Sequence, residues 1–254
     1  MRESRPIYLL AAALSICLTL IICTAILSRS MVRIKSKDEL IHVDGSARKP
    51  IRSDFILWNG SLTQSAPTIA GAYGPLEANV AKVKEYLIAK GVPAGEIVPD
   101  AVSEEPIYEQ VKNPKTGQYV ATDHLIGYTL SQKLAVKSHS VDLVDGLSRQ
   151  STELISQGIP FKSDTPLYIY TKLSELKVSM QADASKNARD RAEQIAASSG
   201  CHLGEVRAAK MFVPQITPLY STQQSDGGNE DTSSLDKNIT AVVSVDYAIR
   251  RKAL

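Results

Sequence analysis

The sequence predicts an α+β fold in which mixed or antiparallel sheets pack with about three helices, preceded by one transmembrane helix. Three observations predict this fold. Apolar residues recur with helical spacing in three segments, apolar and polar residues alternate in several segments between them, and residues 7–27 carry no charge. A helix, a glycine, a short turn and a strand follow one another three times, although the similarity in sequence is too weak to define a repeat.

The uncharged run Ile7–Leu27 has 21 residues. As a helix it is about 31 Å long, which matches a bilayer core of roughly 30 Å. We therefore expect residues 1–27 to be an uncleaved membrane anchor. The alternative is a cleaved signal peptide, since Arg2 and Arg5 precede the run and Cys23-Thr24-Ala25 resembles a cleavage site. The run exceeds the usual apolar region of about 7–15 residues, which favours the anchor.

Residues 28–40 are polar and charged and are interpreted as a juxtamembrane linker, followed by one domain over residues 41–254. The basic residues of this linker favour a cytoplasmic domain, but long domains translocate largely regardless of flanking charge, so these charges leave the orientation open. Cys201 is the single cysteine after the membrane segment, so no intrachain disulfide can form there. A lone thiol fits the cytoplasm and the periplasm alike.

The first half of the domain alternates strands with one helix. Short strands are expected over Leu40–Ala47, Asp54–Thr63 and Glu96–Ser103. Helical spacing predicts a helix, with Pro75 in its first turn and Gly91 at its end, whose inner face is formed by Leu76, Val80, Val83 and Leu87.

A hairpin and a second helix follow. Residues 113–117 have the composition of a hairpin loop between strands Pro106–Lys112 and Gln118–Thr122, and alternation continues to Val136. The second helix is expected from an N-cap at Ser140 to Gly158.

The third predicted helix, Leu176–Ser199, is the longest. It follows a strand over Pro166–Lys172, and its stripe of small residues permits close packing against a sheet. The stripe of this helix consists of Met180, Ala184, Ala188, Ala192 and Ile195. After the helix, strands are expected over Glu205–Val213 and Ile239–Ile249.

A polar stretch of 25 residues, 214–238, separates the last two predicted strands. Loops of this length in a compact domain are usually functional or disordered. Its second half is expected to be mobile, whereas the apolar residues of its first half predict a contact arm used in assembly. The predicted assembly residues are Pro214, Ile216, Pro218, Leu219 and Tyr220.

The sequence contains little that indicates catalysis. The net charge of +2 argues against nucleic-acid binding, and no P-loop, nucleophile elbow or zincin motif occurs. The spacing of the four histidines does not favour a metal site, and the adjacent Cys201 and His202 are expected to point apart. We therefore expect no enzyme, no cofactor and no metal.

Several segments together resemble the SIMPL domain family and its periplasmic immunogenic-protein branch. The resemblance covers residues 41–250 and is carried by residues 127–136, by Val141–Gly158, by Ala188-Arg189 with the glycines at 200 and 204, and by Thr240–Tyr247. Members of the family tend to carry extra glycines and a Pro-Asp pair before the first long strand. This chain has residues 45–54 at that place instead, which affects the expected register of the strand. The resemblance implies export, a domain on the extracytoplasmic side of a bacterial membrane, ring- or cage-like homo-oligomers and no established catalytic residue.

These observations together predict a membrane-anchored extracytoplasmic protein that self-assembles and has a scaffolding role in the cell envelope, with a link to stress tolerance implied by the resemblance. Its expected partners are other copies of itself and a lipid bilayer, reached through Ile7 to Leu27. The alternative is a monomeric or dimeric binding module for a small ligand or an envelope polymer, which predicts a concave pocket with convergent polar groups.

Overall fold

The computed structural model describes residues 17–28, 40–114, 117–221 and 228–251. It confirms an α+β fold with antiparallel strand pairs and with the helices α2 (Ile69–Ala89), α3 (Val141–Gln150), α4 (Thr152–Ser156) and α5 (Leu173–Ser198). The chain divides into two compact units, which are described separately. The predicted single domain over 41–254 and its boundaries stay a prediction.

The predicted membrane segment lies partly outside the described residues, because residues 7–16 are not among them. Residues 17–28 form a helix. Within the described part of the chain, no helix has both the length and the apolar character required to cross a membrane.

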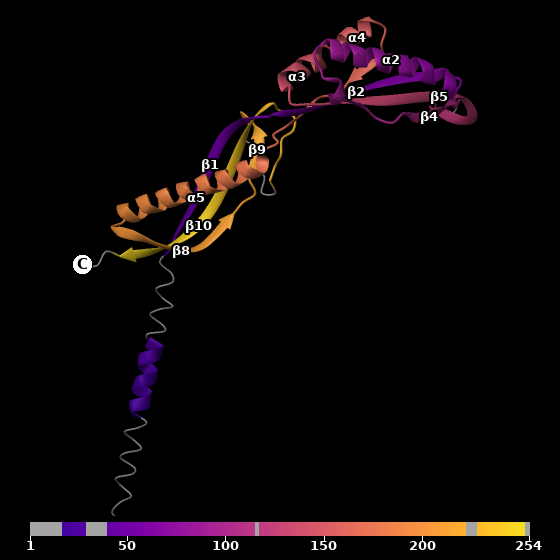
Figure 1. The fold of residues 1–254 in the computed structure, drawn as a ribbon. Helices are drawn as coiled ribbons and strands as arrows, with labels where there is room; N and C mark the ends of the chain where they lie inside the picture. The colour runs from indigo at the N-terminus through magenta and orange to yellow at the C-terminus, as the bar shows by residue number, and fades with distance from the viewer. Residues whose placement is uncertain (1–16, 29–39, 115–116, 222–227, 252–254) are drawn as a thin grey trace, which may run out of the picture. The chain divides into compact units, whose positions relative to one another are not determined.

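The first unit, called the α5 unit here, combines residues up to Ala47 with Gln181–Phe212 and the chain from Ala241 onward. Its sheet has the order β1-β10-β8. β8 (Cys201–Met211) pairs antiparallel with β10 (Asp236–Arg251), in a register that runs from Cys201–Arg251 to Met211–Val243. Helix α5 lies along β1 (Leu40–Arg52) and β10 (Figure 1).

The alanine stripe of α5 explains how closely helix and sheet approach in the α5 unit. Ala184, Ala188, Ala192 and Ala196 are at most 1% exposed. A Cβ atom at Gly45 of β1 would lie 2.2 Å from the Ala184 carbonyl oxygen, so this strand position accommodates only glycine. The close packing expected from the small side chains is therefore confirmed. One member of the predicted stripe was wrong, because Ile195 is 46% exposed and Ala196 faces the sheet in its place.

The second unit, called the hairpin unit here, combines Arg48–Met180 with Val213–Thr240. Its sheet has the order β3-β5-β2-β6, with β4 paired to β5 and β7 paired to β2, all antiparallel. Helices α2 and α3 contact β2 and β5. The strands are β2 (Phe55–Ala66), β3 (Ile97–Pro99), β4 (Ser103–Lys112), β5 (Tyr119–Ser138), β6 (Phe161–Ser163) and β7 (Leu167–Ile169).

The core of the hairpin unit is centred on Trp58, which is 1% exposed. Its ring meets the edge of Phe161 at 5.9 Å between centroids, and its Nε1–H donates to Ser163 Oγ at 3.0 Å. The Phe161 ring also covers Gly60, where a Cβ atom would lie 1.9 Å from Cζ. The aromatic pair thus joins the short strand β6 to β2.

Several predicted boundaries need correction. Helix α2 begins at Ile69 rather than near Pro75, because Thr68 caps it by accepting from the Gly71 N–H at 3.1 Å. The predicted second helix is interrupted at Ser151, and β6 was not predicted. Predicted strand 96–103 is reduced to Ile97–Pro99. The glycine stops at Gly91, Gly158 and Gly200 are confirmed by their φ angles of 101°, 77° and 70°.

Candidate functional site

The predicted assembly residues lie in the hairpin unit, and the structure corrects their description as a loop. Gln215–Pro218 form β9, which pairs antiparallel with the start of β10 through Ile216 and Ile239. Pro214 and Ile216 are buried, and Pro218 and Leu219 are half-buried. Tyr220, by contrast, is 92% exposed. Four of the five residues therefore already have packing partners within the chain, and Tyr220 alone of them presents nearly its whole side chain to solvent.

Tyr220 and Leu219 line a shallow, open groove. The Arg48 guanidinium donates to the Leu219 carbonyl at 3.5 Å, and the Asn238 amide donates to the same oxygen. The full lining is Arg48, Pro50, Leu219, Tyr220, Ser221 and Asn238. This groove offers one cation, one aromatic ring and one amide, but it is too open to surround a ligand.

A buried lysine holds the chain beside this groove. Lys237 is 2% exposed, and its ammonium donates to the Tyr168 carbonyl at 2.6 Å and to the Asp231 carbonyl. Burial lowers the pKa of Lys237 below its ordinary value because the charged form loses hydration. Because the ammonium donates to two backbone carbonyls, Lys237 has a structural role: it links β10 to β7 and to the segment around Asp231.

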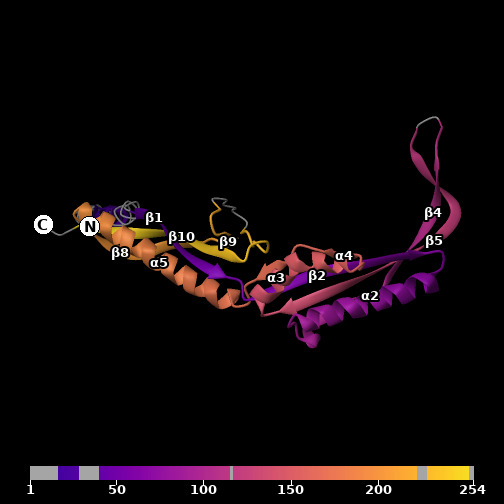
Figure 2. The ribbon, with the colours of Figure 1, turned by 90° about the horizontal axis from the view of Figure 1, so that it is seen from above.

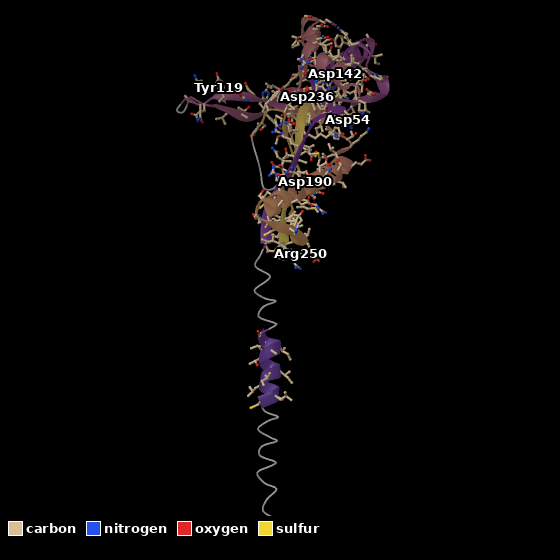
Figure 3. The ribbon with its side chains drawn as sticks, turned by 90° about the vertical axis from the view of Figure 1, so that its left-hand side faces the viewer. Asp54, Tyr119, Asp142, Asp190, Asp236 and Arg250 are labelled. Atoms are coloured by element: carbon tan, nitrogen blue, oxygen red, sulfur yellow. The ribbon has the colours of Figure 1, made fainter. Side chains whose placement is uncertain are left out.

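Exposed apolar side chains of the hairpin unit occur along the ribbon formed by β4 and β5. Up to residue 127, β5 pairs with β4 alone among the described strands, since its pairing with β2 begins at Tyr128. We call residues 107–112 and 119–127 the hairpin arm. Figure 2 shows this arm turning away from α2 and the sheet, and in Figure 3 Tyr119 lies far from Asp54 and Asp142 of the same unit.

Apolar side chains occupy both faces of the hairpin arm. Val111 is opposite Val120 in the register, whereas the next pair, Lys112 and Tyr119, faces the other way. Of the large apolar side chains of the arm, Ile107 is half-buried. The other six are between 42% and 67% exposed: Tyr108, Val111, Tyr119, Val120, Leu125 and Ile126. A cluster of exposed apolar side chains of this kind is typical of a protein interface.

A polar cluster lies on the face of the α5-unit sheet that α5 does not cover. His42 Nδ1 lies 2.6 Å from Asp246 Oδ1, and His42 Nε2 lies 3.2 Å from Ser244 Oγ. Ser244 Oγ lies 2.5 Å from Asp44 Oδ1. We call these four residues the His42 cluster. The hydrogen bond to Asp246 raises the pKa of His42, and the charges of both carboxylates act in the same direction.

The other residues singled out from the sequence are not brought into a catalytic arrangement. The thiol of Cys201 contacts the Ser199 carbonyl at 3.6 Å, and His202 is exposed on β8. Within the described ranges, no three His, Cys, Asp or Glu side chains are placed to hold a metal ion.

Comparison with known families is consistent with this architecture. The sequence model of SIMPL, described as a protein of unknown function (DUF541), matches residues 41–247, from the start of β1 to near the end of β10. The chain belongs to the SIMPL family. No curated protein matches the chain. The match covers strands and helices of both units of this SIMPL protein, including the hairpin arm and the His42 cluster.

Sequence reasoning found the hairpin of this SIMPL protein but missed the exposure of its arm. A signal was present, because the neighbouring pairs Tyr119-Val120 and Leu125-Ile126 break the alternation of a strand with one buried face. The His42 cluster was also missed, since His42 and Asp246 are 204 residues apart. Its only signal is that polar residues at 42, 44, 244 and 246 alternate with buried ones in both strands.

Proposed function

We propose that this SIMPL protein is a membrane-anchored, extracytoplasmic scaffold of the cell envelope, which assembles through its hairpin arm into a ring- or cage-like homo-oligomer. The observation that carries this proposal is the exposed apolar surface on both faces of the arm. The proposed role requires no catalytic residue, and the proposed partner of the arm is a second copy of the chain.

The hairpin arm needs a partner for a physical reason. An isolated two-stranded ribbon is at best marginally stable in water, so an arm with apolar faces gains stability when it is covered. Complete burial of such a side chain contributes about 1.5–3 kcal/mol, and about half of each of the six remains exposed. Covering one arm therefore contributes roughly 5–9 kcal/mol.

That contribution is comparable to the cost of association, about 4–15 kcal/mol. One arm contact alone therefore supports only weak pairing. A closed assembly is favoured, because each copy then both inserts an arm and receives one, and makes two contacts. The net charge of +2 for the whole chain keeps the repulsion between like copies small.

The membrane anchor and the location rest on the sequence. The 21-residue uncharged run Ile7–Leu27 supports a single-pass anchor, and residues 28–40 supply a polar linker between membrane and domain. The extracytoplasmic orientation is supported by the export that the family resemblance implies.

Light scattering on the full-length chain in detergent tests the assembly. We expect a particle mass that is a defined multiple of 27.6 kDa at micromolar concentration. A triple variant, Val111→Thr, Tyr119→Thr and Val120→Thr, has β-branched side chains that favour strands at all three positions but makes the arm more polar. This variant is expected to give a smaller particle.

The matched control is Val178→Thr, since Val178 of α5 is 68% exposed but lies outside the hairpin arm. It is expected to leave the particle mass unchanged. A monomeric wild-type chain contradicts self-assembly, and an unchanged mass for the triple variant with an intact far-ultraviolet spectrum removes the arm from the interface.

A second candidate function is a binding module, and the groove at Arg48 and Tyr220 favours it. A cation beside an exposed aromatic ring suits an anionic sugar polymer. Titration with dextran sulfate, compared with neutral dextran, tests this candidate. Binding that requires Arg48 and Tyr220 supports it, and equal weak binding of both polymers contradicts it.

A further inference from the structure

The positions of the protons in the His42 cluster follow from its distances. The Ser244 hydroxyl has one proton, and the carboxylate of Asp44, which can only accept, lies 2.5 Å from its oxygen. Ser244 Oγ therefore accepts from His42 Nε2 at 3.2 Å. The carboxylate of Asp246 likewise accepts from His42 Nδ1 at 2.6 Å. Both imidazole nitrogens donate, so His42 in this arrangement is an imidazolium.

While His42 is an imidazolium, it cannot activate Ser244 as a nucleophile. A general base beside a serine must accept the hydroxyl proton at Nε2, whereas Nε2 of the imidazolium donates. In this arrangement the Ser244 hydroxyl donates to Asp44. The cluster instead places one cation between two carboxylates on neighbouring strands.

We propose that the His42 cluster is a pH-sensitive switch, which fastens the first residues of β1 to β10 while His42 carries both protons and loosens them when one proton is lost. The inference does not rest on the proposed assembly. It concerns the strand that directly follows residues 28–39, at one end of the β1-β10-β8 order.

The first residues of β1 are held by their pairing with β10, by packing on α5 and, on the open face, by this cluster. Val43 and Gly45 face α5 and are buried. Leu40, His42 and Asp44 lie on the opposite face of the strand and are exposed. Arg191 of α5 donates to the Asp44 backbone carbonyl at 3.1 Å. On the open face, the His42 cluster supplies the side-chain bonds between the two strands.

The charged groups around His42 explain the direction of the switch. Asp44 faces it from β1, and Asp246 faces it from β10. On β8, Lys210 is opposite Ser244 in the register, with its ammonium placed over the Phe212 ring at 4.8 Å. When His42 becomes neutral, the two carboxylates lose the cation between them. Lys210 does not replace that cation, because its ammonium lies over the Phe212 ring.

The sign of the pH dependence follows. The pKa of His42 is raised in the folded chain, so the folded, fastened state binds the proton more tightly than the open state does. The stabilisation is complete below the ordinary histidine pKa of 6.5 and is lost as the pH rises through the raised pKa. Each pKa unit between the two states corresponds to about a tenfold change in the ratio of fastened to open strand.

Two measurements on the full-length chain in detergent test the proposal together. The ¹³Cε1 shift of His42, followed by NMR, gives its titration midpoint. Hydrogen exchange of amides 41–46, corrected for the intrinsic effect of pH, gives the ratio of fastened to open strand. We expect the loss of protection at high pH to equal the fold-change that the measured midpoint predicts.

The variants separate the switch from a general effect of pH. His42→Gln keeps a hydrogen-bonding side chain but does not titrate, and is expected to abolish the pH dependence of amides 41–46. Asp246→Asn is expected to lower the midpoint of His42. The matched control is His124→Gln, because His124 pairs with Glu109 at 3.3 Å on the hairpin arm, outside the α5 unit. It is expected to leave amides 41–46 unchanged.

Three results would overturn the proposal: a His42 midpoint at or below 6.5, protection of amides 41–46 that is independent of pH, or the same pH dependence in His42→Gln. A monomeric chain that retains the switch would contradict the proposed assembly but not this inference.

Discussion

Replacing Gly45 by alanine tests the close approach of α5 and β1 that defines the core of the α5 unit. The new Cβ atom would lie 2.2 Å from the Ala184 carbonyl oxygen and 2.5 Å from both the nitrogen and the Cβ atom of Ala188. Two of these three atoms belong to the helix backbone, so no side-chain rotation relieves the contact. Ordinary contacts begin at 3.4 Å, and α5 must therefore move away by roughly 1 Å.

The cost follows from that displacement. Overpacking of a well-packed core costs about 1–3 kcal/mol, and the upper end applies here because backbone must move and the alanines beside Gly45 are fully buried. We expect Gly45→Ala to lower the free energy of unfolding by about 3 kcal/mol, as measured by urea denaturation followed by circular dichroism.

Gly146→Ala is the matched control. A Cβ atom at Gly146 meets nothing within 4 Å, and the residue lies within helix α3. The same chemical change should therefore stabilise the protein, by up to about 1 kcal/mol. A Gly45→Ala variant within about 0.5 kcal/mol of the wild type would refute the reasoning, since surface substitutions without packing consequences fall in that range.

Two further substitutions test the hairpin unit. Gly60→Ala is expected to lower the free energy of unfolding by about 1–3 kcal/mol, because the Phe161 ring, 1.9 Å from the new Cβ atom, must move. Since this ring packs on Trp58, the near-ultraviolet circular dichroism of Trp58 is expected to decrease. An unchanged signal would contradict that packing. Tyr168 donates to Asp145 at 2.7 Å, and burial and this bond raise its pKa to about 12. The native chain therefore keeps this proton above the ordinary pKa of 10.0, so stability falls between about pH 10 and 12. Tyr168→Phe is expected to remove that fall in urea denaturation at alkaline pH, and an unchanged pH profile would contradict it.

The long regular elements were predictable because each carries its own periodic signal. Four of the five residues predicted for the stripe on α5 are buried, Ile195 being the exception, and the five alternate residues from Ile239 to Tyr247 in β10 are all buried. Glycine stops such as Gly200 were predictable as well, because a positive φ angle at the end of a helix favours that residue.

The errors have local physical causes. Proline is favoured in the first turn of a helix, which is why the sequence predicts a start near Pro75. The Thr68 cap and the buried Ala72 instead place the start of α2 six residues earlier, at Ile69. β6 and β9 have three and four residues, too few for a period to appear. Polar flanking residues concealed β9, whose Ile216 is nevertheless 3% exposed.

The candidate sites were less predictable than the fold because they depend on pairing between distant strands. Tyr220 was chosen for its apolar character, and it is the exposed member of the predicted set. The exposure of Val111 and Val120 depends on β2 pairing with β5 only from Tyr128 onward, which the sequence of the hairpin does not encode. The His42 cluster likewise exists only because β1 lies beside β10.

An image of the full-length protein extracted from membranes by cryo-electron microscopy tests the central claim most directly. The proposal predicts a closed assembly in which the hairpin arm of each copy is covered by a neighbouring copy and the uncharged segments Ile7–Leu27 converge on one patch of detergent or lipid. Single copies, or an assembly in which Val111, Tyr119 and Val120 all face solvent, would contradict it.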